Sequence, residues 1–144
     1  MSLTDEERLQ AVVYRLEKSR NTLADAERVI AMQMWTTGAN RLYYAAYYAV
    51  SALLVANGIS AKTHEGIIRM FNQHFVMTGK VERELGRQYN ILFTMRLTGD
   101  YGDCFDLQEK DVAPMVGPAR ELVTVVSALA EETLSDRRHS NANI

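Results

Sequence analysis

Cysteine, proline and glycine are scarce in this chain, and neither sign of charge dominates it. There is one cysteine, Cys104, with two prolines and eight glycines among 144 residues. A single cysteine excludes an internal disulfide framework and a zinc site built from several cysteines. The net charge of −2 gives no overall basic field that attracts nucleic acid or anionic lipid, so the choice of partner must depend on local patches.

The chain also lacks a long apolar run and an apolar leader. No uninterrupted apolar segment approaches the ~20 residues of a membrane span. The first ten residues, MSLTDEERLQ, are acidic and polar where a signal peptide is basic and then apolar. We therefore predict a cytoplasmic protein without a membrane segment. The 47% apolar and 24% charged residues predict one globular domain, residues 1–136, followed by a disordered tail at 137–144.

Apolar residues recur at three- and four-residue spacing through most of the chain, which is the period of an α-helix, while strand-like alternation is essentially absent. The predicted fold class is therefore all-α, an up-and-down bundle of four to five helices. The predicted helices cover about 4–32, 37–57, 63–74 and 81–97, with a last helix that is capped by Asp106 or Asp111.

Local signals set the expected ends of these helices. Thr4 followed by Glu7 is typical of a capping box, and Thr63 is a suitable N-cap for the third helix. Gly58 follows the second helix, where a left-handed residue is needed. Gly99 is expected to end the fourth helix and to open the longest irregular stretch, a kind of loop in which functional sites are often found.

The second predicted helix is apolar on several sides. Tyr43, Tyr44, Tyr47 and Tyr48 spread around a core face made of Leu42, Ala45, Ala46, Ala49, Val50, Leu53 and Leu54. A helix of this kind is covered by neighbours on several sides. We expect it to be central in the bundle and also to meet a second subunit.

Arg96 falls on the apolar stripe of the fourth predicted helix, close to Leu85 and Leu92 on a helical wheel. A guanidinium there keeps its proton, so it needs a carboxylate, carbonyls or a phosphate to offset its desolvation. Asp100 is the nearest carboxylate. Two interpretations stay open: a structural ion pair that fixes the turn at Gly99, or an anion clamp whose planar fork matches phosphate oxygens.

His64 follows the Thr63 cap, so it lies at a helix N-terminus whose partial positive charge favours a neutral ring. A neutral imidazole can act as a general base, but it can equally bond to its own cap or to a neighbouring carboxylate. His74 and His139 show no metal-ligand spacing with it. We predict no metal and no cofactor.

The stretch NRLYYAAYY, residues 40–48, combines one positive charge with four phenol rings. Such a mix can stack bases and hold phosphate, although most such rings belong to a core or an interface. Arg41 lies near Tyr44 on the helical wheel and could stack on it. The candidate nucleotide- or RNA-binding residues are therefore Arg41, Tyr44, Arg96 and Asp100.

Three blocks, NRLYYAAYYAVSALL, KTHEGIIRMF and MRLTGDY, followed by a final helix, together resemble the HEPN superfamily of prokaryotic helical domains. The resemblance covers roughly residues 5–135 and points to small stand-alone members with an Arg-x-x-Gly/Ala-Asp-Tyr signature. It implies a helical bundle that forms a homodimer, often with the two signature arginines facing one composite groove. It also implies a link to RNA or nucleotides. Many members are metal-independent ribonucleases, often toxins, and many are encoded beside a minimal nucleotidyltransferase.

The chain departs from the ribonuclease motif of the family, an arginine followed after four to six residues by a histidine. Arg96 matches the arginine, but Tyr101 stands five positions later. A tyrosine of ordinary pKa near 10 is a poor base at neutral pH. Arg96, Tyr101 and His64 are therefore candidate catalytic residues of an activity that stays open. In related two-gene systems the nucleotidyltransferase modifies a tyrosine just beyond the motif, and Tyr101 is a possible analogue that does not match that position.

These features support three functional hypotheses. The first is a nucleotide- or RNA-binding HEPN protein that is the toxin-like partner of a nucleotidyltransferase. The second is an active metal-independent endoribonuclease with Arg96 at a composite dimer site. The third is a non-catalytic bundle that docks another protein, with the pair of Arg96 and Asp100 serving only as a brace.

Overall fold

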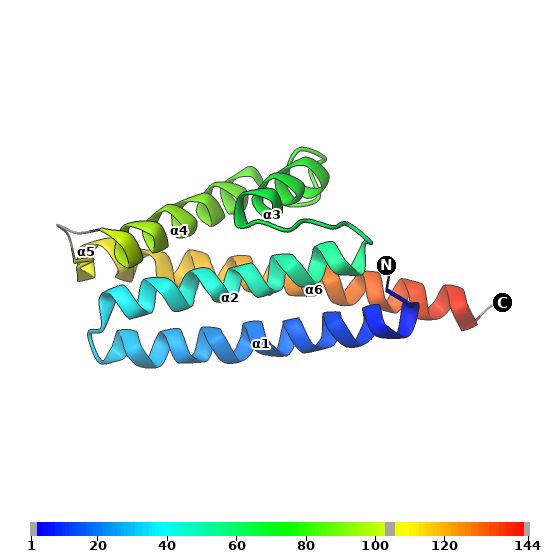
Figure 1. The fold of residues 1–144 in the computed structure, drawn as a ribbon, viewed down its shortest axis with the longest axis horizontal. Helices are drawn as coiled ribbons and strands as arrows, with labels where there is room; N and C mark the ends of the chain where they lie inside the picture. Colours follow the sequence, from blue (N-terminus) through cyan, green and yellow to red (C-terminus); the bar gives the residue numbers. More distant parts are fainter. Residues whose placement is uncertain (1–2, 103–105, 143–144) are drawn as a thin grey trace.

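The computed structural model describes residues 3–102 and 106–142, with side chains up to residue 137, and within these ranges it contains helices and no strand (Figure 1). Cys104 lies outside the described residues. The all-α helical bundle predicted from the sequence is confirmed. The helices are α1 (Asp5–Ala31), α2 (Trp35–Ala56), α3 (His64–Phe71), α4 (Arg83–Tyr101), α5 (Glu109–Val112) and α6 (Val116–Ala142). A π-helical turn, Asn72–Val76, extends α3, and a 3-10 turn, Ala113–Met115, joins α5 to α6.

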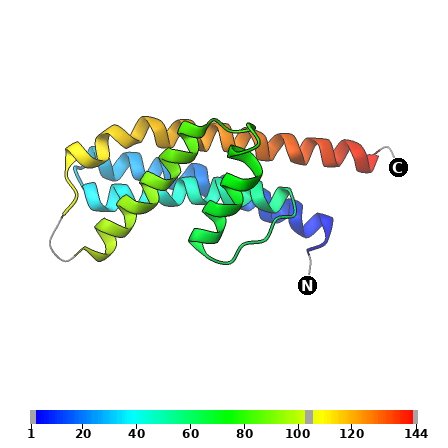
Figure 2. The same ribbon diagram turned by 90° about the horizontal axis from the view of Figure 1, so that it is seen from above.

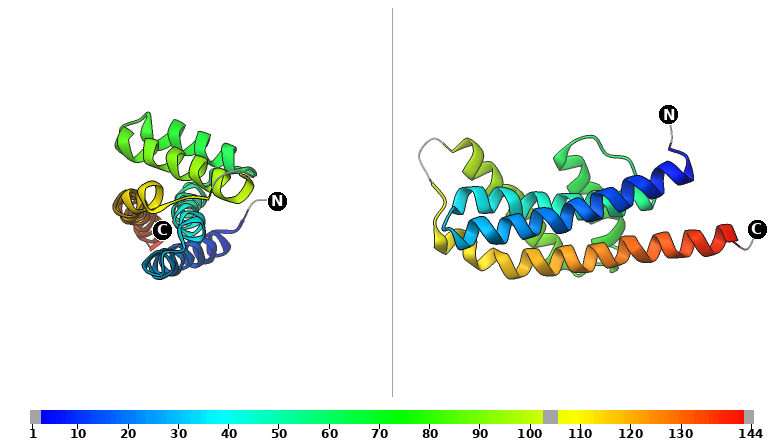
Figure 3. Two further views of the ribbon diagram at one scale, coloured as in Figure 1. Left: turned by 90° about the vertical axis from the view of Figure 1, so that its left-hand side faces the viewer. Right: turned by 90° about the horizontal axis from the view of Figure 1, so that it is seen from below.

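Helix α2 is the centre of the bundle. It packs against α1, α3, α4 and α6, and the end-on view in Figure 3 shows it between α1 below and α4 above. Every residue of its predicted core face is buried, with at most 2% of its surface exposed. The prediction of a central helix is therefore confirmed, and the small alanines on this helix let its neighbours approach closely.

Helices α1, α2 and α6 run alongside one another, while α3 and α4 cover one side of this layer (Figures 1 and 2). The turn between α1 and α2 is tight, and Gln33 within it has a left-handed φ of 62°. Gly58, with φ 70°, follows the C-cap Asn57 of α2. A left-handed glycine directly after the C-cap is what the sequence predicts there.

The capping box at the start of α1 is present. The Thr4 hydroxyl accepts a hydrogen bond from the Glu7 backbone N–H at 3.1 Å, and the Glu7 side chain accepts one from the Thr4 N–H at 3.2 Å. Two backbone donors that the helix itself cannot satisfy are thereby paired.

We expect Thr4→Ala to lower the free energy of unfolding by about 1 kcal/mol, because the cap is lost. Urea denaturation measures this change. Thr124→Ala is the matched control, since the Thr124 hydroxyl bonds to the carbonyl of Arg120 within α6 and alanine is a good helix former. A loss of equal size in both variants would contradict the capping account.

Gly99 does not end the fourth helix, so the sequence-based prediction was wrong there. Helix α4 continues to Tyr101 and ends at the C-cap Gly102. A Cβ atom on Gly99 would lie 3.0 Å from a methyl group of Leu107 and 3.2 Å from one of Thr36. The glycine therefore provides space for close packing rather than a left-handed turn.

The last helical region begins at Glu109, between the candidate caps Asp106 and Asp111, and neither of them is its N-cap. Gln108 is the N-cap of α5, and Asp111 lies at its third position, where its carboxylate accepts a hydrogen bond from the Gln108 N–H at 3.0 Å. Asp106 is not the cap. At the other end, α6 continues to Ala142, into the segment predicted as a disordered tail, because adding residues to an existing helix costs much less than starting one.

The stretch Glu109–Arg137 is long and apolar enough to cross a membrane by length and composition, although the sequence has no uninterrupted apolar run of that length. Core helices pass the same test, and α6 packs against α1, α2 and α4. Its side chains Ala119, Leu122, Val126 and Ala130 are fully buried in the bundle.

Candidate functional site

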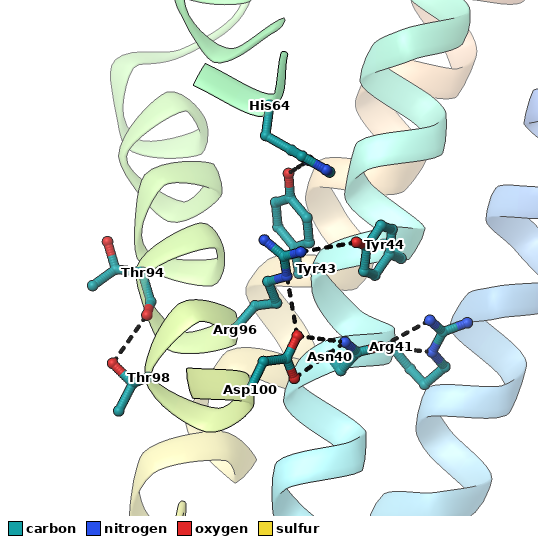
Figure 4. A network of polar contacts seen from close by, with 9 residues as sticks. All are labelled: Asn40, Arg41, Tyr43, Tyr44, His64, Thr94, Arg96, Thr98 and Asp100. Carbon is teal, nitrogen blue, oxygen red and sulfur yellow. Dashed lines mark hydrogen bonds and ion pairs between the residues drawn. The ribbon is translucent and has the colours of Figure 1, made fainter. Parts of the chain in front are cut away.

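Arg96 lies on the buried face of α4, and only 9% of the residue is exposed. Its Nη2 donates a hydrogen bond to the Tyr44 hydroxyl at 3.0 Å, and its Nε lies 3.2 Å from Asp100 Oδ2 (Figure 4). The Nε–H does not point along this ion pair, so this buried donor has no hydrogen-bond partner among the described residues. An arginine at this depth with an unsatisfied donor is costly unless something else binds to it.

Three tyrosine rings surround the guanidinium. Its carbon lies 5.5 Å from the centre of the Tyr43 ring, 5.4 Å from Tyr44 and 5.8 Å from Tyr101, all within cation–π distance. Tyr43 is fully buried, whereas Tyr101 is 70% exposed. The arginine is therefore enclosed by rings on the core side and reaches solvent beside Tyr101.

Asn40 links Asp100 to a second arginine (Figure 4). Its amide nitrogen donates to Asp100 Oδ2 at 3.0 Å. Its carbonyl oxygen accepts hydrogen bonds from Arg41 Nε at 3.0 Å and Nη2 at 2.8 Å. We call Arg96, Asp100, Asn40, Arg41 and Tyr44 the Arg96 cluster. Two guanidinium groups and one carboxylate give it a formal charge of +1.

His64 is the first residue of α3, directly after the N-cap Thr63, whose hydroxyl accepts a hydrogen bond from the Gly66 N–H at 2.9 Å. Its Nδ1 lies 2.5 Å from the Tyr43 hydroxyl, and its ring centre is 4.8 Å from that of Tyr47. The ring thus belongs to the same aromatic layer that encloses Arg96, although no direct bond joins the two residues.

Burial, and then the positive charge of Arg96, lower the pKa of His64 below its usual 6.5, while Glu65 opposes this shift. The ring is therefore neutral at pH 7, as expected for this helix position. Burial raises the pKa of the Tyr43 hydroxyl, so that group keeps its proton and can donate to Nδ1. In the other tautomer, Nδ1–H donates to Tyr43 and leaves Nε2 as a proton acceptor.

The lowered pKa of His64 makes stability depend on pH. Just below pH 6.5 the unfolded chain binds more protons than the folded protein, so we expect the free energy of unfolding to fall as the pH decreases through this range. The fall levels off below the folded-state pKa. Urea titrations between pH 7.5 and 5.5 measure it. His64→Gln should remove this contribution and His74→Gln should keep it; an identical profile in wild type and His64→Gln would show that His64 is not its source.

The structure brings most of the candidate residues together. Arg96 contacts Asp100, Tyr44 and Tyr101, and Arg41 lies with its guanidinium carbon 5.3 Å from the Tyr44 ring centre. His64 joins them only through the tyrosines. Sequence reasoning missed Asn40, which holds Asp100 from another helix. Among residues 3–102 and 106–137, no three His, Cys, Asp or Glu side chains lie close enough to hold a metal ion.

Comparison with known proteins identifies the fold family. The family model of the HEPN domain matches residues 12–132, which are most of the chain. The chain belongs to the HEPN family. In this HEPN domain the match includes α2, α3 and α4, which carry the whole Arg96 cluster and His64.

Relatives extend this assignment. The HEPN chain is 37% identical over 126 residues to a UPF0332 protein of Thermotoga maritima, with 88% of this chain and 96% of that protein aligned. It is 28% identical to a Methanocaldococcus jannaschii protein named as a candidate toxin, over 67% of this chain and 65% of that protein. The crystal structure of TT1696 from Thermus thermophilus has the same fold, with a TM-score of 0.66, 19% identity and coverage of 85% of this chain and 97% of that one.

Proposed function

We propose that this HEPN protein binds RNA or a nucleotide through a phosphate group at the Arg96 cluster. The observation that carries the proposal is the state of Arg96: nine-tenths buried, enclosed by tyrosines, and with a buried Nε that lacks a hydrogen-bond partner among the described residues. One carboxylate offsets the desolvation of the guanidinium only in part. A phosphate offers several oxygens to the planar fork of arginine.

The charge of the cluster supports an anionic ligand. Asp100 neutralises Arg96, and Asn40 bridges Asp100 and Arg41, because its amide nitrogen donates to the carboxylate and its carbonyl oxygen accepts from the Arg41 guanidinium. The remaining positive charge, on Arg41, lies over the Tyr44 ring. The exposed Tyr101 ring lies next to Arg96, and a base could stack on its phenol face. A ligand with both a phosphate and a base fits this combination better than a simple anion does.

The wider role we propose is that of a toxin-like component of a two-gene system, acting as a cytoplasmic homodimer beside a minimal nucleotidyltransferase. Support comes from membership of the HEPN family and from a relative that is named as a candidate toxin. The exposed side chains of Leu97 and Tyr101 at the end of α4 offer apolar surface next to the cluster, where a second subunit would complete a shared groove.

A second candidate function is metal-independent cleavage of RNA, and the position of His64 favours it. His64 and Arg96 both contact Tyr43 and Tyr44. In this reaction Nε2 of His64 takes the proton of the ribose 2′-hydroxyl, and the 2′-oxygen attacks the phosphorus. The bond to the 5′-oxygen breaks, and that oxygen takes a proton from Tyr101 or water. Arg96 stabilises the charge on the phosphoryl oxygens.

One experiment tests both functions. Purified protein is titrated into a fluorescent single-stranded RNA in EDTA, and binding is followed by anisotropy while cleavage is followed on a gel. Saturable binding supports the proposed binding of RNA. Cleavage products that form in the presence of EDTA support metal-independent cleavage as well. Absence of both, with a folded protein by circular dichroism, would contradict the proposal and favour a bundle that docks another protein.

A further inference from the structure

A row of tyrosines and basic side chains continues from the Arg96 cluster along α2 and onto α1. The ring centres of Tyr44 and Tyr48, one turn apart on α2, are 6.0 Å apart. The Nζ atom of Lys18 on α1 lies 4.8 Å from the centre of the Tyr48 ring and 5.7 Å from that of Tyr14. Lys18 thus lies between the ring of Tyr14 on its own helix and the ring of Tyr48 on α2.

The basic side chains of this row are free to meet an anion. Lys18 and Arg15 have no carboxylate within ion-pair distance among the described side chains, and Arg15 instead donates to the Ser51 hydroxyl at 3.0 Å. Four other surface arginines are paired, Arg20 with Glu131, Arg28 with Asp25, Arg87 with Glu84 and Arg120 with Glu27, whereas the exposed Arg69 and Arg83 form no ion pair among the described side chains. The row therefore places two cations without ion-pair partners beside phenol rings, on a chain whose net charge is −2.

The rings of the row become more exposed with distance from the core. Tyr43 is fully buried, Tyr44 and Tyr48 are half-buried, and Tyr14 is 62% exposed beside Val13, which is 46% exposed. The buried Tyr43 is explained by packing, whereas the exposed phenol of Tyr14 lies against the Lys18 ammonium group, with Nζ 5.7 Å from the ring centre. Such a pair offers a ring face and a charge to a ligand in solvent.

The geometry suits an extended ligand. Positions 41, 44, 48 and 51 fall on one stripe of α2, and the helix rises about 15 Å along them. Tyr44 links the stripe to Arg96 through its hydroxyl group. Figure 1 shows α1 running beside α2 on the side away from α3 and α4, so the row extends across two neighbouring helices.

We infer that Tyr14, Arg15, Lys18, Tyr44 and Tyr48 form a track for single-stranded RNA that leads to the Arg96 cluster. The inference rests on the proposed function and names its substrate class. Bases stack on the phenol rings, and phosphates lie against Arg15 and Lys18. Double-stranded RNA does not fit this track, because its bases are already stacked on one another.

Two variants at exposed positions test the track in the full-length protein. The probe is a fluorescent single-stranded oligoadenylate of about 12 nucleotides, within the range of known single-strand site sizes. We expect Tyr14→Ala to weaken binding by about tenfold through the loss of one stacked base. Lys18→Gln should make the slope of log K against log salt shallower by about 0.7, the value for one phosphate contact.

Matched controls lie off the track. Lys110→Gln removes the same charge from an exposed position on α5, and Met77→Ala removes an apolar side chain that is 79% exposed; both should bind as the wild type does. Binding of uridine monophosphate at the Arg96 cluster should be unchanged in both track variants, and thermal midpoints should show that all four proteins are folded.

The outcomes separate the track from the proposed function. Weaker oligoadenylate binding with intact uridine monophosphate binding supports the track. Unchanged oligoadenylate binding in both track variants rejects the track and leaves the proposed function standing, and so does equally tight binding of an RNA duplex. Loss of dimerisation without loss of RNA affinity would assign this face to protein contact and also overturn the inference. If the wild type binds neither probe, the proposed function fails together with the track.

Discussion

Replacing Arg96 by alanine is expected to weaken the binding of single-stranded RNA about a hundredfold while the HEPN bundle stays folded. The loss is large because a buried guanidinium that contacts a phosphate contributes through both charge and hydrogen bonds. The fold survives because Asp100 keeps its hydrogen bonds from Asn40 and its side chain is 27% exposed to water. Anisotropy measures the affinity, and urea denaturation measures the free energy of unfolding.

The Arg96→Lys variant separates the effect of the positive charge on RNA affinity from the effect of the planar guanidinium. Lysine keeps the positive charge but loses the planar fork, so we expect an affinity between those of the wild type and Arg96→Ala. If the pair of Arg96 and Asp100 serves only as a structural brace, the pattern differs. Arg96→Ala then lowers the free energy of unfolding strongly, while the RNA affinity of the folded fraction is unchanged. That pattern would favour the docking hypothesis over a binding site.

The Asp100→Ala variant is expected to be less stable than the wild type by about 2–3 kcal/mol, because it leaves a buried guanidinium without its carboxylate. The expected loss of stability is at the lower end of the range for broken buried ion pairs, because the Asp100 side chain is partly exposed. Inorganic phosphate should then restore stability, since an anion that binds only the folded state at about 100 times its Kd contributes about 2.7 kcal/mol.

Thermal denaturation with increasing phosphate at constant ionic strength measures this rescue. Glu27→Ala is the matched control, because it removes the carboxylate of the exposed ion pair with Arg120. That variant should lose at most about 1 kcal/mol and gain no more stability from phosphate than the wild type does. Equal phosphate responses in Asp100→Ala, Glu27→Ala and wild type would mean that phosphate does not take the place of the Asp100 carboxylate beside Arg96.

Local chemistry accounts for the parts of the fold that the sequence predicts well. The cap at Thr4, the cap at Thr63 and the left-handed Gly58 depend on a few neighbouring residues, so each can be read from the chain. The prediction at Gly99 was wrong because a glycine also serves close packing. Leu107 and Thr36, which occupy the space beside it, meet it only in the folded bundle.

The candidate site was predictable only in part for the same reason. The helical period places Arg96 on a buried face, and Asp100 is correctly identified as its partner. The pair forms because α4 continues one turn beyond the expected end, which puts the two residues four positions apart on one helix. Asn40 lies 60 residues from Asp100 in the chain, so no local pattern could join them.

The tyrosines show the same limit. Four tyrosine rings on one helix indicate that neighbours cover this helix on several sides. A helical wheel, however, does not show which of the four rings is the most buried. Tyr43 is fully buried because α3 and α4 close over it, bringing His64 and Tyr89 to its ring. Tyr44 and Tyr48 stay half-buried, Tyr44 against Arg96 of α4 and Tyr48 against Lys18 of α1. Tertiary packing thus decides which phenols belong to the core and which can meet a ligand.

Nuclear magnetic resonance of the arginine side chains tests the contact between Arg96 and phosphate most directly. The Nε–Hε resonance of Arg96, assigned by its absence from the spectrum of Arg96→Lys, is followed as an uncleavable 2′-O-methyl oligonucleotide is added. The account predicts a saturable shift of this resonance at the concentrations that give binding by anisotropy, with the Arg120 resonance unchanged. An Arg96 resonance that stays in place while the oligonucleotide binds would contradict it.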